Sequence, residues 1–175
     1  RLDSVIEQVA SSRTEIIRVS AYASIAMHWL PGIIQRFREE CPDVDVDIRM
    51  ADHVDVPYEL LAQGKMDAIL VSPQDEGQYE WVHLADDPMF AVLPKDFDTQ
   101  GMTAFPLAAF EARDFIMPSQ GFDKDIMRIF NRIGVKPHIL PTWVDDPTVI
   151  SMVSHGLGVS MMTELTVRGR TDGVK

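Results

Sequence analysis

Five short segments carry the side chains of this chain that are best placed for binding chemistry. Each follows a predicted strand or opens a predicted helix: Ala23, Ser24 and Ile25; His53 and Val54; Ser72; Ser119, Gln120 and Phe122; Asp145 and Asp146. In an open parallel sheet, ligands bind beyond the carboxyl ends of the strands, near helix N-termini whose free N–H groups attract anions. We therefore expect these segments to supply one ligand-binding site.

The elements that must position the first three segments follow from hydrophobic periodicity. Apolar residues recur at helical spacing from Leu30 to Phe37, and Pro31 fits the first turn of that helix. Residues 44–50 alternate between apolar and charged side chains, which predicts a strand. A second helix is expected to end at Gly64, before a short apolar strand at 68–71. With a strand at 16–20, this order predicts two βα units and a parallel sheet.

The second half of the chain continues with strands and helices in alternation. We expect strands at 79–84, 89–93, 115–117, 139–140 and 159–162, and helices at 105–110, 123–133 and 147–155. Asp145 or Asp146 is expected to cap the last of these helices, with Pro147 in its first turn. The fold class is therefore α/β.

Composition limits the function. The chain has 175 residues and a net charge of −11, which opposes direct binding to DNA because affinity for phosphates depends largely on Lys and Arg. The single cysteine, Cys41, excludes an internal disulfide and fits a reducing cytoplasm. No apolar run is long enough to span a membrane, and no charged-then-apolar leader opens the chain.

The sequence contains no pattern typical of an enzyme or a metal protein. The five histidines lie too far apart for a paired metal motif, and there is no nucleophile elbow or phosphate-binding loop. The 27 acidic residues are scattered, as on a solvated surface, and the ten methionines are expected to fill gaps in the core. We therefore predict no catalytic residue, no metal ligand and no cofactor.

Two blocks of residues closely resemble the effector-binding domain of LysR-type transcriptional regulators. The first block is Arg18-Val19-Ser20, Pro31, Phe37, Pro42-Asp43-Val44, Leu61, Gly64 and Asp67-Ala68-Ile69. The second is Phe115 to Ser119, Ile133-Gly134-Val135 and Val153 to Val159, with Gly156-Leu157-Gly158-Val159 at its end. Together the blocks span residues 18–164, nearly the whole chain.

The resemblance implies a fold like type II periplasmic binding proteins, with two Rossmann-like subdomains joined by two crossover strands. Residues 1–15 would then be the end of a linker helix. Residues 16–87 and 162–175 would form subdomain I, and residues 88–161 would form subdomain II. A small-molecule effector would bind in the cleft between the subdomains.

The resemblance also assigns roles to site residues. Ser24 lies in the loop that contacts the effector in this family, with an ordinary helix N-cap as the alternative. Phe122 lies at a position whose ring often lines the cleft, with plain core packing as the alternative. Ser119 and Gln120 are either helix caps or hydrogen-bond donors to the ligand, and His53 is either a surface residue or part of the site.

The residues at the site also bear on the charge of the ligand. Ser72 is a neutral hydroxyl where some family members carry an arginine that can pair with a carboxylate. Three aspartates, Asp52, Asp145 and Asp146, are expected near the mouth of the site. A neutral, zwitterionic or cationic effector is therefore favoured over a doubly charged anion.

The leading interpretation is thus the effector-sensing domain of a cytoplasmic LysR-type regulator, which reaches DNA only through a winged helix-turn-helix domain absent from this chain. The resemblance implies a homodimer or homotetramer, in which the helix 33–40 of one copy meets the helix 126–133 of another, and no membrane partner. The alternative is an extracytoplasmic solute receptor of a transporter, which would share the fold. An enzyme on the same scaffold would need an acid–base pair that the sequence does not offer.

Overall fold

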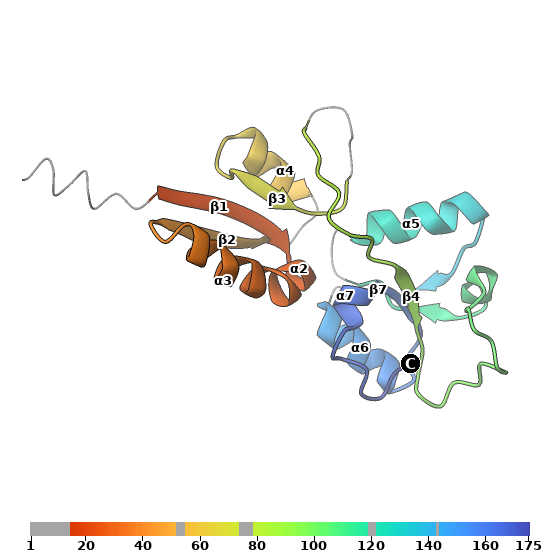
Figure 1. The fold of residues 1–175 in the computed structure, drawn as a ribbon. Helices are drawn as coiled ribbons and strands as arrows, with labels where there is room; N and C mark the ends of the chain where they lie inside the picture. The colour runs from red at the N-terminus through yellow and green to blue at the C-terminus, as the bar shows by residue number, and fades with distance from the viewer. Residues whose placement is uncertain (1–14, 52–54, 74–78, 119–121, 143) are drawn as a thin grey trace, which may run out of the picture. The chain divides into compact units, whose positions relative to one another are not determined.

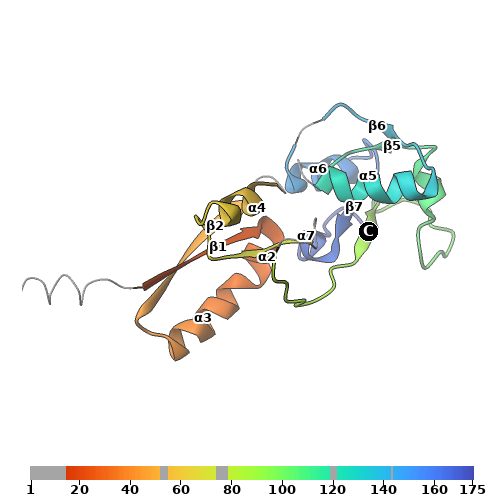
Figure 2. The same ribbon diagram turned by 90° about the horizontal axis from the view of Figure 1, so that it is seen from above.

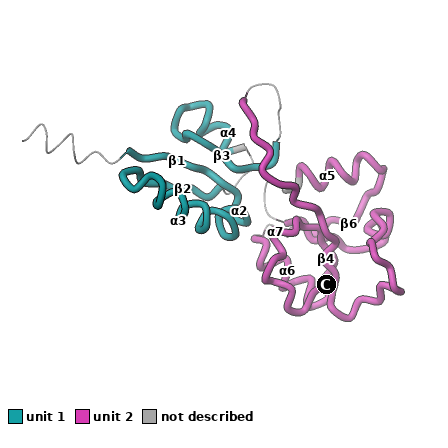
Figure 3. The backbone as a smooth tube through the Cα atoms, in the orientation of Figure 1, with its two compact units in different colours: residues 1–78 teal, residues 79–175 magenta. Residues whose placement is uncertain are grey.

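The computed structural model describes residues 15–51, 55–73, 79–118, 122–142 and 144–175. The chain divides into two compact units, unit 1 at residues 1–78 and unit 2 at residues 79–175 (Figure 3). Among the described residues, no helix combines the length and the apolar character needed to cross a bilayer. The linker helix expected over residues 1–15 falls almost entirely outside the described part of the chain.

Unit 1 is built on a three-stranded parallel sheet. Its strands β1 (Glu15–Tyr22), β2 (Val44–Ala51) and β3 (Ala68–Leu70) lie in the order β2-β1-β3. The helices α2 (Ala23–His28) and α3 (Leu30–Glu40) connect β1 to β2, and α4 (Asp55–Ala62) connects β2 to β3. In Figure 1, α2 and α3 lie on one side of these strands and α4 on the other. The two predicted βα units are confirmed.

Local sequence explains where the helices of unit 1 begin and end. Pro31 lies in the first turn of α3, where a missing N–H costs little, and Leu30 is buried. Gly64 has a φ of 65°, the left-handed conformation that glycine adopts without strain, just after α4. Both residues were predicted at these positions from the sequence.

Unit 2 contains the elements β4 (Met89–Val92), the 3₁₀ helix η1 (Leu107–Phe110), β5 (Asp114–Phe115), α5 (Phe122–Ile133), β6 (His138–Ile139), α6 (Asp146–Ser154), β7 (Ser160–Thr163) and α7 (Glu164–Val167). Strand β4 pairs antiparallel with β7, and β5 pairs parallel with β6. The Val159 carbonyl accepts a 2.9 Å hydrogen bond from Ile116 N–H, and Val159 N–H donates a 2.9 Å hydrogen bond to the Asp114 carbonyl. These two bonds join the β5–β6 pair to the β4–β7 pair. Figure 2 shows α5 beside the β5–β6 pair.

Two apolar clusters fill the interior of unit 2. Because side chains alternate along a strand, Phe115 and Ile116 enter different clusters, and so do Met161 and Met162. The first cluster includes Ile126 and Phe130 of α5, and the second includes Val149, Ile150 and Val153 of α6. The strands of unit 2 are therefore covered on both faces, as an α/β fold requires.

The structure corrects one expectation. Residues 79–84 are not a strand, because the described ladders pair β3 with β1 and β4 with β7, and an extended segment becomes a strand only when a neighbour pairs with it. Residues 162–175 lie in unit 2. Two 2.9 Å backbone hydrogen bonds between Leu93 and Lys175, together with the bond from Lys95 N–H to the Gly173 carbonyl, hold the end of the chain there. The subdomain bounds expected from the sequence, 16–87 with 162–175 and 88–161, stay a prediction.

Candidate functional site

The carboxyl ends of the strands of unit 1 bring two of the predicted segments together. Strands β1 and β3 are neighbours, with Ala21 opposite Leu70, so the segments that follow them leave the same edge of the sheet. Ala23, Ser24 and Ile25 follow β1 as the first turn of α2, and Ser72 follows β3. The Tyr58 hydroxyl of α4 donates a 2.7 Å hydrogen bond to the Ser72 carbonyl, which fixes the backbone there.

The structure resolves one alternative for Ser24. The N-cap position of α2 is Tyr22, so Ser24 lies inside the first turn and is not an ordinary N-cap residue. Its side chain is half-buried, as is that of Ile25, whereas Ala23 is exposed. The Tyr22 side chain makes no capping hydrogen bond at this end of α2. The role of Ser24 in ligand binding stays a prediction.

A buried hydroxyl in β1 was missed by sequence reasoning. Ser20 is 1% exposed, and among the described residues its Oγ has no hydrogen-bond partner. A buried polar atom without a partner costs about 1–3 kcal/mol, so such atoms need an explanation. Ser20 lies just before the candidate segment, and its hydroxyl is able to bond a water molecule or ligand that reaches it. The signal in the sequence was a lone polar residue between Val19 and Ala21, which are both buried.

In unit 2, the predicted Asp145 cap is present. Asp145 is the N-cap of α6 and accepts a 3.0 Å hydrogen bond from Thr148 N–H, and Pro147 lies in the first turn. Hydrogen bonding to Thr148, first by its side chain and then by its backbone, lowers the pKa of Asp145. This carboxylate is therefore ionised at neutral pH and already satisfies a helix end. Asp146 follows as the first residue of the helix and is half-buried.

The remaining predicted site residues lie outside the part of the chain whose side chains the structure describes. His53 and Val54, and also Ser119 and Gln120, lie outside the described residues. Phe122 is the first residue of α5, in agreement with a helix that opens here, but only its backbone is described. These residues remain predictions from the sequence.

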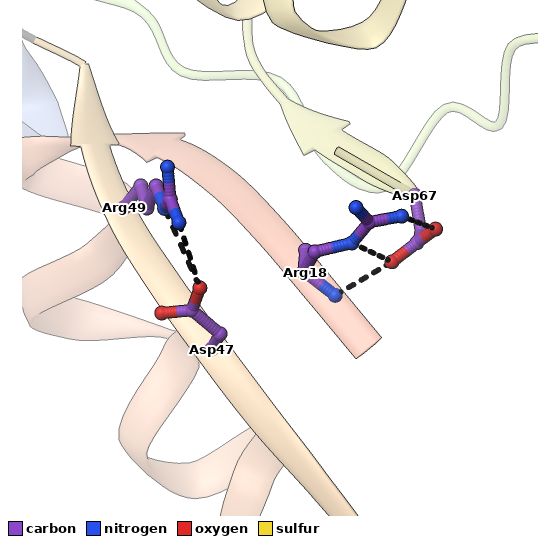
Figure 4. A network of polar contacts seen from close by, with 4 residues as sticks. All are labelled: Arg18, Asp47, Arg49 and Asp67. Atoms are coloured by element: carbon purple, nitrogen blue, oxygen red, sulfur yellow. Dashed lines mark hydrogen bonds and ion pairs between the residues drawn. The ribbon is translucent and has the colours of Figure 1, made fainter. Parts of the chain in front are cut away.

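An ion pair fastens β3 to the central strand β1 (Figure 4). Arg18 donates from Nε and an Nη to the two carboxylate oxygens of Asp67, at 3.0 and 2.8 Å, and its backbone N–H adds a 2.8 Å bond. Asp67 N–H donates to the Arg18 carbonyl at 2.8 Å. The Arg18 side-chain bonds, followed by its backbone bond, lower the pKa of Asp67 to about 2. The contact positions β3, and with it Ser72.

We expect this ion pair to make acid stability depend on Asp67. Because the folded pKa is depressed, the stabilisation is present above the ordinary pKa of 3.8 and is lost as pH falls toward 2. Asp67→Asn should therefore lose less stability than the parent protein between pH 4 and pH 2 in urea unfolding. The effect is modest, because the side chains are 39% and 43% exposed. Glu59→Gln, an exposed residue of α4, is the control; equal pH slopes for parent and Asp67→Asn would contradict the prediction.

The described residues contain no group of three or more His, Cys, Asp or Glu side chains that could hold a metal ion. What the geometry of unit 1 offers instead is hydroxyl and backbone groups at the end of a parallel sheet. Such an arrangement is suited to hydrogen bonding a small polar molecule.

Comparison of the fold identifies the class of protein. Solved structures of LysR effector-binding domains superpose on nearly the whole chain, so the fold is that of type II periplasmic-binding-protein-like domains. The LysR substrate binding domain family matches residues 10–174, and the chain belongs to this family.

Individual relatives agree with this assignment. The chain is 24% identical over 168 residues to the HTH-type transcriptional regulator YvbU of Bacillus subtilis, covering 94% of this chain and 57% of the relative. It is similar to the CcmR regulatory domain of Synechocystis PCC6803 in complex with 2-PG, with a TM-score of 0.79, 17% identity and coverage of 92% and 79%. The BenM effector binding domain with benzoate has a TM-score of 0.77, 18% identity and coverage of 92% and 75%. The chain thus spans between about half and three fifths of the length of the curated regulators that it matches first.

Proposed function

We propose that this chain is the effector-sensing domain of a LysR-type transcriptional regulator of the cytoplasm. It binds a small metabolite through residues at the carboxyl end of the parallel sheet of unit 1, with Ser24 and Ser72 as hydrogen-bonding groups. It passes the signal to a DNA-binding domain of the same regulator, within a homodimer or homotetramer, and carries out no reaction itself. Such signalling needs only a difference in ligand affinity between two arrangements, typically about 1–3 kcal/mol.

The family match over residues 10–174 carries this proposal. The curated proteins that the chain matches first are HTH-type transcriptional regulators, which favours a regulator over a transport receptor. Two structures of similar fold are complexes with small molecules, benzoate and 2-PG, and these support a small organic ligand for this chain as well.

The residues of this chain narrow the class of ligand. The segments after β1 and β3 offer neutral side chains, Ser24 and Ser72, rather than cations. Arg18, the arginine of β1, is already bonded to Asp67 by two side-chain donors. The chain as a whole has a net charge of −11. A neutral, zwitterionic or cationic metabolite therefore fits better than a dicarboxylate.

A thermal-shift screen of amino acids, aromatic acids, sugar acids and dicarboxylates tests the proposal. A ligand present at a hundred times its Kd should stabilise the folded protein by about 2.7 kcal/mol, which raises the Tm by roughly 5–10 °C. Ser24→Tyr should abolish this shift without unfolding the protein, whereas Ser151→Tyr, on the exposed surface of α6, should retain it. A ligand that stabilises Ser24→Tyr as much as the parent would place the site elsewhere. Tight binding of a dicarboxylate would contradict the ligand class.

A further inference from the structure

The chain enters unit 2 through a largely exposed segment that is neither helix nor strand. Residues 79–86, which we call the entry segment, precede β4, and no backbone–backbone hydrogen bond joins them to another described segment. The side chains of Val82 and Leu84 are 72% and 60% exposed. His83 and Asp86 form an ion pair at 3.0 Å within the segment. The entry segment therefore lacks the backbone pairing that fixes a strand in place.

The next two residues, in contrast, are bonded to the start of α7. Asp87 Oδ1 accepts a 3.0 Å hydrogen bond from Leu165 N–H, and the Pro88 carbonyl accepts a 2.9 Å hydrogen bond from Glu164 N–H. Asp87 is half-buried, and Leu165 is 3% exposed. Strand β4 begins one residue later, at Met89. These two bonds therefore mark the point at which the chain becomes fixed in unit 2.

The same bonds supply partners that α7 needs. The first N–H groups of a helix have no acceptor within the helix. In α7 the Thr163 hydroxyl accepts a 3.4 Å hydrogen bond from Thr166 N–H, and residues 87 and 88 serve the N–H groups of Glu164 and Leu165. Because Leu165 and Thr166 are buried, water would not readily replace the Asp87 carboxylate as an acceptor. The contact therefore stabilises α7 and the start of β4 together.

We propose that Asp87 anchors the end of the entry segment to α7, so that the chain bends ahead of Asp87 while residues 87 and 88 keep their place in unit 2. Hinges in proteins consist of a few loop or element-terminal residues that absorb changes in backbone angles. The entry segment and its anchor have this form. The inference goes beyond the proposed function, since it assigns Asp87 a conformational role that involves no ligand. Asp87 is thus a positioning residue.

Hydrogen–deuterium exchange, measured at single amides of the folded chain, tests the anchor. In the parent protein the amides of Glu164 and Leu165 should be protected, whereas those of the entry segment should exchange fast. Asp87→Ala removes the acceptor, so the Leu165 amide should exchange roughly tenfold faster or more. The Glu164 amide should follow, because the residue after Asp87 is released as well. The amides of Ile116 and Val159, which join the strands of unit 2, should keep their protection.

Two further variants separate the anchor from a general effect of removing a carboxylate. Asp86→Ala is the matched control, because the Asp86 side chain is 96% exposed and is paired with His83. It should leave the exchange of the Leu165 amide unchanged. Asp87→Asn keeps an oxygen acceptor at the same position and should retain most of the protection. If Asp87→Asn loses as much protection as Asp87→Ala, the side-chain hydrogen bond is not the anchor.

Exchange of the parent protein in low concentrations of urea decides the question if Asp87→Ala does not fold. The amides of Glu164 and Leu165 should then lose protection together, because both depend on the same opening. They should do so at a lower urea concentration than the amides of Ile116 and Val159. Separate loss of the two α7 amides would contradict the anchor.

Three other results would overturn the proposal. They are an unprotected Leu165 amide in the parent, unchanged exchange of this amide in Asp87→Ala, and an equal loss of protection at Ile116 and Val159, which would indicate general destabilisation. The measurement requires no metabolite. Failure of the anchor therefore leaves the sensing function standing, and failure of the thermal-shift screen leaves the anchor standing.

Discussion

Phe130→Ala is expected to destabilise unit 2 by about 3–5 kcal/mol, the usual cost of removing a buried phenylalanine. Phe130 has no exposed surface, and its ring meets the rings of Phe110 and Phe115 edge to face at centroid distances of 5.6 and 5.2 Å. The same substitution removes two aromatic pairs, each worth about 0.5–1.5 kcal/mol beyond the buried area. Urea unfolding followed by circular dichroism measures the loss.

Phe90→Ala is the matched control, because Phe90 lies on β4 of the same unit but is 46% exposed. Its cost should be well below that of Phe130→Ala. A Phe130→Ala protein that unfolds at the same urea concentration as Phe90→Ala would show that α5 does not depend on this cluster.

Gly158→Ala is expected to destabilise unit 2 by about 3 kcal/mol, at the upper end of the cost of overpacking. A Cβ at this position would lie 2.7 Å from the Asp114 carbonyl oxygen and 3.1 Å from Cγ1 of Ile116. The carbonyl cannot move away freely, because it accepts the 2.9 Å hydrogen bond from Val159 N–H that joins the strands. The substitution therefore strains the connection between β5 and β7. Thermal and urea unfolding should both show it.

Gly32→Ala tests the same exchange where nothing obstructs the new methyl group. Gly32 lies within α3, and among the described residues no atom outside the neighbouring turns of that helix comes within 4 Å of the added Cβ. Alanine should therefore stabilise the protein by about 0.5–1 kcal/mol. If Gly158→Ala and Gly32→Ala were equally stable, the close approach at Gly158 would not be a constraint on the fold.

The sequence predicted most elements of the fold because the residues that begin and end its helices act locally. Pro31, Gly64 and Asp145 each act within one turn of chain, and the structure places each at the helix end where it was expected. The strand predicted at 79–84 was wrong for the opposite reason. Alternation of apolar and polar residues indicates an extended chain, whereas a strand depends on a neighbour elsewhere in the sequence. The division of the chain after Gln78 also depends on distant contacts, such as that between Leu93 and Lys175.

The candidate site was less predictable than the fold. Ser24 and Ser72 could be predicted to follow neighbouring strands because β1 and β3 end at the same edge of a parallel sheet, which follows from topology. Their role in ligand binding stays a prediction. Ser20 was missed, because a small residue in a buried strand looks the same in sequence whether or not its hydroxyl has a partner. The sequence also does not distinguish Gly156 from Gly158. The structure shows that Gly156 has a φ of 73° and open space around its Cβ position, whereas Gly158 lies in close contact with Asp114.

The pairing of β4 with β7 has a consequence for how the chain folds during synthesis. Unit 1 has all three of its strands once Leu70 has left the ribosome. Strand β4 must wait for Ser160–Thr163 before its ladder can form. Domains tend to fold from the N-terminus as translation proceeds, and strands awaiting their partner are prone to aggregate. Among the described strands, the apolar segment Met89–Val92 therefore stays without its partner for the longest part of synthesis.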